Sequence, residues 1–167
     1  MIGVASYQLI EGQNLNFAIP SEKITSLILT EENKISITEE VFGQESKAKK
    51  DSDYAEAYKK ALYFIDKKEY EKALPYLEIA IKTDILSLKE KVYFNIGFCY
   101  GNLGNHIKDA IEAFKQAIRI DPDHVYSHFG LGFSYFRIGD KSSALNEYKI
   151  LKNLDINLAN QLFDKIY

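Results

Sequence analysis

Residues 96–100 are Ile-Gly-Phe-Cys-Tyr and residues 131–135 are Leu-Gly-Phe-Ser-Tyr, and this shared pattern decides the fold. In both segments a tyrosine follows the glycine by three residues, a spacing that places the two positions on one face of a helix. A weaker copy lies upstream, where Ala61 replaces the glycine and Phe64 replaces the tyrosine. The pattern predicts three related helices, each with a small and an aromatic residue on its packing face.

A second repeated feature lies downstream of each of these helices. An alanine is followed four residues later by a large apolar residue, at Ala73 and Leu77, Ala110 and Phe114, and Ala144 and Tyr148. Equivalent positions recur every 34 to 37 residues. Because both features share one period, the sequence indicates an internal repeat whose unit is a pair of helices.

The segments between the helices carry turn residues. Leu103-Gly104-Asn105 and Ile138-Gly139-Asp140 place a glycine where the first helix of a unit ends, since glycine adopts the left-handed conformation that stops a helix. Asp121-Pro122 is typical of the start of the next unit, with Asp as N-cap and Pro at the first helical position. Together these segments resemble the tetratricopeptide repeat (TPR) family. The resemblance implies a right-handed superhelix of helical hairpins that binds another polypeptide.

The resemblance covers residues 53–167, with repeats at about 54–86, 90–122 and 123–154 and a capping helix at about 156–166. The predicted fold class is all-α: a tetratricopeptide superhelix of three repeats and a capping helix, with a small N-terminal appendage of β-strand and helix. The first repeat departs most from the family pattern, because Lys67-Lys68 stands where a turn glycine is usual. Pro75 lies within its second helix, where it either bends the helix or sits in the first turns.

Residues 1–29 have a different character. Polar and apolar residues alternate from Asn14 to Ile19, which predicts a half-buried strand, and Pro20 ends it. Gly3-Val4-Ala5-Ser6-Tyr7 and residues 11–20 resemble the C-terminal end of a trypsin-like, HtrA-type serine protease domain. That resemblance implies a catalytic triad further upstream, and none of its motifs lies in this sequence. Residues 30–52 are rich in Glu, Lys, Ser and Gln and predict a polar linker, with a frayed helix near Glu39–Val41 as the alternative.

Composition restricts the classes of partner. The formal net charge is −3, so there is no general electrostatic attraction to nucleic acid or to an anionic membrane. No apolar run approaches the roughly 20 residues of a membrane-spanning helix, and the N-terminus lacks the basic start of a signal peptide. Cys99 is the single cysteine, so no internal disulfide is predicted and the compartment stays open.

Candidate chemical groups are sparse. His124 and His128 lie four residues apart, which permits a shared metal, but no cysteine or second histidine pair completes a ligand set. A core or half-buried packing role for His128 is the better interpretation, and Cys99 is predicted to be a small buried apolar residue. The glycines at 101–104 and 130–132 follow no predicted strand, so they indicate helix packing rather than a phosphate loop. We predict no catalytic residue, no metal site and no cofactor.

One set of residues is not needed for packing within the repeats. The first helix of each repeat carries a second apolar stripe, and by resemblance to the family this face lines a concave groove. The predicted groove residues are Tyr58, Leu62, Ile65, Phe94, Phe98, Asn102, Tyr126, Phe129, Phe133, Phe136 and Arg137. Some family members grip an acidic C-terminal tail with basic and amide groups. That clamp is absent here, because Tyr58, Leu62 and Tyr126 occupy its positions and only Asn95 matches.

The sequence thus predicts a protein–protein interaction module that binds an apolar or amphipathic peptide segment in an aromatic groove. Two occupants of the groove remain open: a partner peptide, or this chain itself through its N-terminal segment or a second copy. The competing functional class is the C-terminal portion of a trypsin-like serine endopeptidase whose repeats recruit substrate or partners.

Overall fold

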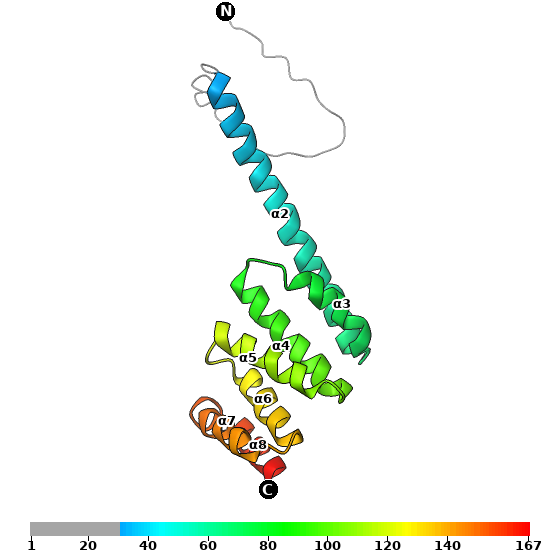
Figure 1. Cartoon of the computed structure of the whole chain (residues 1–167), viewed down its shortest axis with the longest axis vertical. Helices are drawn as coiled ribbons and strands as arrows, with labels where there is room; N and C mark the ends of the chain where they lie inside the picture. The colour runs from blue at the N-terminus through cyan, green and yellow to red at the C-terminus, as the bar shows by residue number, and fades with distance from the viewer. Residues whose placement is uncertain (1–30) are drawn as a thin grey trace, which may run out of the picture. The chain divides into compact units, whose positions relative to one another are not determined.

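The computed structural model describes residues 31–167, with side chains from residue 47 onward, and residues 45–167 form one compact unit. The described residues are all-helical, as predicted, and contain no strand (Figure 1). The predicted strands and protease-like segment, residues 1–29, lie outside the described residues. In chain order the helices are α2 (Glu31–Asp66), α3 (Tyr70–Ala80), α4 (Leu86–Leu103), α5 (Ile107–Ile120), α6 (Val125–Arg137), α7 (Lys141–Leu154) and α8 (Ile156–Ile166).

Helix α2 begins within the predicted polar linker, residues 30–52. The prediction allows a frayed helix near Glu39–Val41, and the structure has one continuous helix from Glu31 onward. Glu, Lys, Gln and Ala are good helix formers in their own right, so a polar stretch of this composition can be helical without a core to pack on. None of the described helices is both long enough and apolar enough to cross a membrane.

The helices pair as hairpins: the C-terminal part of α2 with α3, α4 with α5, and α6 with α7 (Figure 1). The first and third hairpins turn in the same way. The Glu69 N–H donates to the Phe64 carbonyl and the Asp140 N–H to the Tyr135 carbonyl, both at 2.9 Å. Lys68 has φ 60°, close to the 82° of Gly139. The first repeat therefore reaches the left-handed turn without a glycine, and lysine occupies that conformation.

The connection between α5 and α6 corrects one prediction. Asp121 does not cap α6; it ends α5, and its Oδ1 accepts from the Asp123 N–H at 3.2 Å. Helix α6 starts later, at Val125, and the N-cap is His124, whose ring accepts from the Ser127 N–H. The Asp-Pro pair forms a turn instead, because the His124 N–H bonds back to the Asp121 carbonyl.

Small residues lie where helices cross, as the repeat pattern predicts. Phe114 on α5 is 4% exposed and lies between Gly97 of α4 and Gly130 of α6. A Cβ atom added to Gly97 would come within 2.8 Å of the Phe114 ring, and one added to Gly130 within 2.5 Å. Gly132 is covered in the same way by Leu162 of α8, so α8 closes the last hairpin.

Pro75 is the sixth residue of α3, beyond the first turn. It cannot donate the backbone hydrogen bond of a helix interior, yet α3 continues to Ala80. Ala73, Leu77 and Ala80 on the same helix are fully buried, so contacts with neighbouring helices stabilise α3 across this defect.

A candidate peptide-binding cleft

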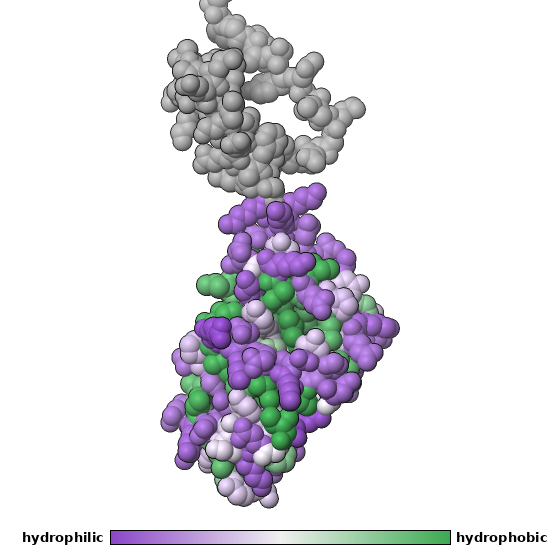
Figure 2. All heavy atoms as spheres, in the orientation of Figure 1, coloured by the Kyte–Doolittle hydropathy of each residue, from purple (hydrophilic) through white to green (hydrophobic). Residues whose placement is uncertain are grey.

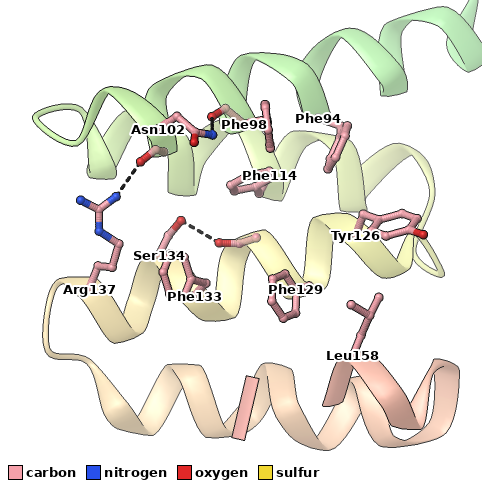
Figure 3. A pocket seen from close by; sticks show the side chains of 12 residues that line it. Phe94, Phe98, Asn102, Phe114, Tyr126, Phe129, Phe133, Ser134, Arg137 and Leu158 are labelled. Carbon is pink, nitrogen blue, oxygen red and sulfur yellow. Dashed lines mark hydrogen bonds between the residues drawn. The ribbon is translucent and has the colours of Figure 1, made fainter. Parts of the chain in front are cut away.

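A cleft of about 400 Å³ opens between α4 and α6 (Figure 3). Helices α4 and α6 are the first helices of the second and third hairpins and contact each other directly. Apolar residues also reach the surface of the repeats, where Figure 2 shows them gathered among hydrophilic ones. The residues that line the cleft are Phe94, Phe98, Gly101, Asn102, Phe114, Tyr126, Phe129, Gly130, Phe133, Ser134, Arg137 and Leu158.

The two walls of the cleft repeat one pattern. Phe94, Phe98 and Asn102 follow one another at intervals of four on α4, and Phe129, Phe133 and Arg137 do so on α6. Each α6 residue lies 35 positions after its α4 equivalent, one repeat later. Spacing by four keeps each row on one helix face, so two phenylalanines and a terminal polar residue line each wall.

The base of the cleft comes from a different helix. Phe114 projects from α5 between the two walls, and its ring centroid lies 6.1 Å from that of Phe94.

Gly101 lines the cleft from α4, and a Cβ atom added there would meet nothing within 4 Å. Leu158 adds an aliphatic side chain from α8. The cleft thus combines residues of two hairpins and the capping helix.

Arg137 and Asn102 mark one end of the cleft. Arg137 Nη1 donates to the Gly101 carbonyl oxygen at 2.6 Å, which joins α6 to α4 (Figure 3). Asn102 Nδ2 donates to the Phe98 carbonyl at 2.8 Å within its own helix. Arg137 is the one charged side chain among the lining residues, and it is exposed.

Around Phe94 the neighbouring groups are aromatic and polar. The His124 ring lies 5.1 Å from the Phe94 ring, and Tyr126 is 61% exposed at the rim. His124 Nδ1 accepts from the Ser127 N–H, so its other nitrogen carries a proton toward Glu90, whose Oε1 is 3.2 Å away. That contact has the length of an ion pair but does not meet hydrogen-bond geometry, so the buried Glu90 Oε1 has no hydrogen-bond partner among the described residues.

The structure brings seven of the predicted groove residues together in the cleft: Phe94, Phe98, Asn102, Tyr126, Phe129, Phe133 and Arg137. The other four lie elsewhere. Tyr58 accepts a 2.9 Å hydrogen bond from Asn95 Nδ2, and with Ile65 it packs on the core around α2 and α3. Leu62 is 39% exposed, and Phe136 packs on the core around α7 and α8.

Five lining residues were not predicted: Gly101, Phe114, Gly130, Ser134 and Leu158. The sequence predicts Phe114 as a repeat position but not as a groove residue. Gly101 and Ser134 lie on the same helix face as the predicted residues, so the helical period could have identified them. Leu158 could not be identified in this way, because no local sequence pattern shows that the capping helix extends to the cleft.

His128 and Cys99 are buried structural groups. His128 Nδ1 lies 2.7 Å from Glu147 Oε2, and Nε2 lies 2.8 Å from the Pro122 carbonyl. The hydrogen bond to Glu147 is the main cause that raises the pKa of His128, against the opposing effect of burial. Burial raises the pKa of Cys99 to about 12. Residues 47–167 contain no cluster of three or more His, Cys, Asp or Glu side chains placed to hold a metal ion.

A family model for a TPR repeat matches residues 105–139, which run from α5 through α6. A TPR repeat-containing protein of Methanocaldococcus jannaschii is 31% identical over 113 residues, which are 67% of this chain and 19% of that protein. The solved structure of MamA AMB-1 is 28% identical with a TM-score of 0.55, over 59% of this chain and 56% of that one. MamA from Desulfovibrio magneticus RS-1, at 22% identity and a TM-score of 0.57, covers 74% and 73% of the two chains and shares the fold.

The chain spans under a fifth of the archaeal relative's length and little more than half of the MamA AMB-1 chain. None of these matches supports the protease-like segment predicted at residues 1–29. The family model, the archaeal relative and the MamA structures together support the tetratricopeptide repeat family for this chain.

Proposed function

We propose that this chain binds an apolar or amphipathic segment of a partner protein in the cleft between α4 and α6. Tetratricopeptide repeats indicate a protein–protein interaction module. The observation that carries the finer proposal is a cleft of about 400 Å³ whose walls are rows of phenylalanine that folding leaves open to solvent. A concave site lined mainly by aromatic side chains favours an apolar ligand surface.

The dimensions suit a short segment with a few anchors. Phe129 and Arg137 are eight residues apart on α6, a separation of roughly 12 Å along the helix axis. Phe98 is 37% exposed and Phe129 and Phe133 are half-buried, so each retains apolar surface that a ligand can cover. A well-buried aromatic anchor at an interface contributes about 2 kcal/mol or more.

The test uses peptides selected on the full chain. A library of random displayed peptides is selected on the immobilised protein, and the enriched peptides are titrated in solution by fluorescence anisotropy. We expect enrichment of peptides with several large apolar residues. Phe133→Ala removes the central anchor of the α6 wall and weakens binding by about tenfold or more.

Two further variants locate the site. Gly101→Leu directs a side chain into space that is now open, so it blocks the cleft while leaving helix α4 intact. Phe163→Ala is the matched control, because Phe163 is 40% exposed on α8 and does not line the cleft. Equal affinity of the wild type and Phe133→Ala for the selected peptides would show that the binding site is elsewhere.

The chain itself is the alternative occupant. A synthetic peptide with the sequence of residues 2–19, added in trans, and the concentration dependence of the protein's mass in solution examine the two self-binding arrangements. The proposal is supported if a partner peptide binds, the residue 2–19 peptide does not bind, and the mass of the protein does not change with concentration. Tight, Phe133-dependent binding of the residue 2–19 peptide would assign the cleft to the chain's own N-terminal segment.

The protease alternative rests on residues 1–29 alone. We expect no labelling of this chain by a serine-directed fluorophosphonate, because its histidines lie in the helical repeats and no nucleophile motif is present. Stoichiometric labelling of one serine would contradict this.

A further inference from the structure

We propose that the segment bound in the cleft carries an Asp or Glu side chain one helical turn beyond its apolar anchors, and that this carboxylate pairs with Arg137. The inference rests on the proposed function, since it specifies the chemistry of the ligand at the same cleft. It adds a requirement that an aromatic groove alone does not impose.

Charge in the cleft has one sign. The lining residues include no Asp, Glu or Lys, and Arg137 is the only one with a charge, in a chain whose formal net charge is −3. No carboxylate among the described side chains forms a salt bridge with Arg137. Glu90 of α4 does not line the cleft; it is 7% exposed and faces His124.

Arg137 is held in place with most of its donors unused. One N–H of the guanidinium bonds to the Gly101 carbonyl at 2.6 Å, and this contact holds the side chain at one end of the cleft. A guanidinium has five N–H donors, so the remaining ones can bind a carboxylate in the two-pronged geometry that arginine favours. Preorganisation by the Gly101 bond reduces the conformational freedom that such a pair would otherwise lose on binding.

The row on α6 sets the spacing. Phe133 and Arg137 are four residues apart, which is roughly 6 Å along the helix axis. In a helical ligand whose apolar anchor lies over Phe133, an acidic residue one turn from that anchor therefore reaches Arg137. A lysine or arginine at that position of the ligand would instead meet the like charge of Arg137. Such repulsion disfavours ligands with a basic residue there.

The experiment selects peptides with C-terminal amides on the full-length wild type, on Arg137→Glu and on Arg119→Glu. Arg119 is the other arginine of the chain, is exposed on α5 and lies outside the cleft, so it controls for overall charge. We expect acidic residues beside the apolar anchors on the wild type and on Arg119→Glu, and basic residues there on Arg137→Glu. Circular dichroism establishes that each variant is folded, and Arg137→Gln serves as a second, milder variant.

Titration then isolates the pair. Replacing Glu by Gln in a selected peptide should weaken binding to the wild type by about fivefold, and should leave binding to Arg137→Gln unchanged. If Glu and Gln peptides bind the wild type equally while Phe133→Ala still weakens both, the acidic requirement is wrong and the proposed function stands. If a peptide binds the wild type with a free C-terminus but not as the C-terminal amide, the carboxylate is terminal and the side-chain assignment is wrong. If no apolar peptide is enriched, the proposed function fails, and this inference fails with it.

Discussion

His128 Nδ1 lies 2.7 Å from Oε2 of Glu147, a contact that joins α6 to α7 within the third hairpin. The second ring nitrogen lies 2.8 Å from the Pro122 carbonyl. Both partners are acceptors, so both nitrogens donate only when the imidazole is protonated. The side chain is 5% exposed, so two hydrogen bonds inside the protein stabilise the protonated form of this imidazole.

Stability should therefore depend on pH through His128. Its pKa is raised in the folded state above the ordinary value of about 6.5. Its contribution is fully present below that ordinary value and is lost as the pH rises through the folded-state pKa. We expect the wild-type unfolding free energy to fall over that range, because the charged hydrogen bond to Glu147 is lost. His128→Gln should remove this fall in urea unfolding measured at several pH values.

His106 is the matched control for that measurement. Its side chain is 45% exposed, and its salt-bridge partner among the described residues is the exposed Asp109 of α5. His106→Gln should keep the wild-type pH dependence, and a flat profile in this variant would contradict the assignment to His128.

Replacing glycine by alanine on α4 and α6 should lower the stability at two positions and raise it at a third. Gly130→Ala and Gly97→Ala press a methyl group against the Phe114 ring, which cannot retreat from one glycine without meeting the other, so each should destabilise by about 1–3 kcal/mol. Gly101→Ala meets open space in a helix and should stabilise by up to about 1 kcal/mol. Thermal unfolding of the three variants checks the order, and a stabilised Gly130→Ala would show that Phe114 is not confined between the helices.

The packing of the capping helix α8 should depend more on Leu162 than on its neighbour Phe163. Leu162 is fully buried over Gly132, so Leu162→Ala should cost about 2–5 kcal/mol of unfolding free energy. Phe163→Ala removes a larger side chain that is 40% exposed and should cost less. Chemical denaturation compares the pair, and equal losses would mean that α8 does not cover the third hairpin as described.

Cys99 should be unreactive in the native protein. The thiol is fully buried, and burial raises its pKa to about 12, so almost no thiolate is present near neutral pH. We expect no modification by a chromogenic disulfide reagent until denaturant is added, and then one thiol per chain. Rapid reaction under native conditions would show that α4 opens locally at this position.

Particular residues show how far sequence alone extends. The spacing of Gly97 and Tyr100, repeated at Gly132 and Tyr135, is enough to predict helices that pack in a repeating way, because these are relations within one helix face. The same logic identified Phe94 and Phe98 with Phe129 and Phe133 as a stripe. It failed at the Asp121-Pro122 pair, which predicted an N-cap that His124 provides instead.

The cleft itself belongs to the tertiary structure. Tyr58, Leu62 and Ile65 carry the same local pattern as the phenylalanines, yet Tyr58 bonds to Asn95 and none of the three reaches the cleft. Phe114 and Leu158 reach it from α5 and α8. Sequence periodicity fixes which side chains share a helix face, since the helix repeats every 3.6 residues. Whether two such faces meet, or leave a space between them, depends on the distance between helices, which side chains from other repeats set when they pack.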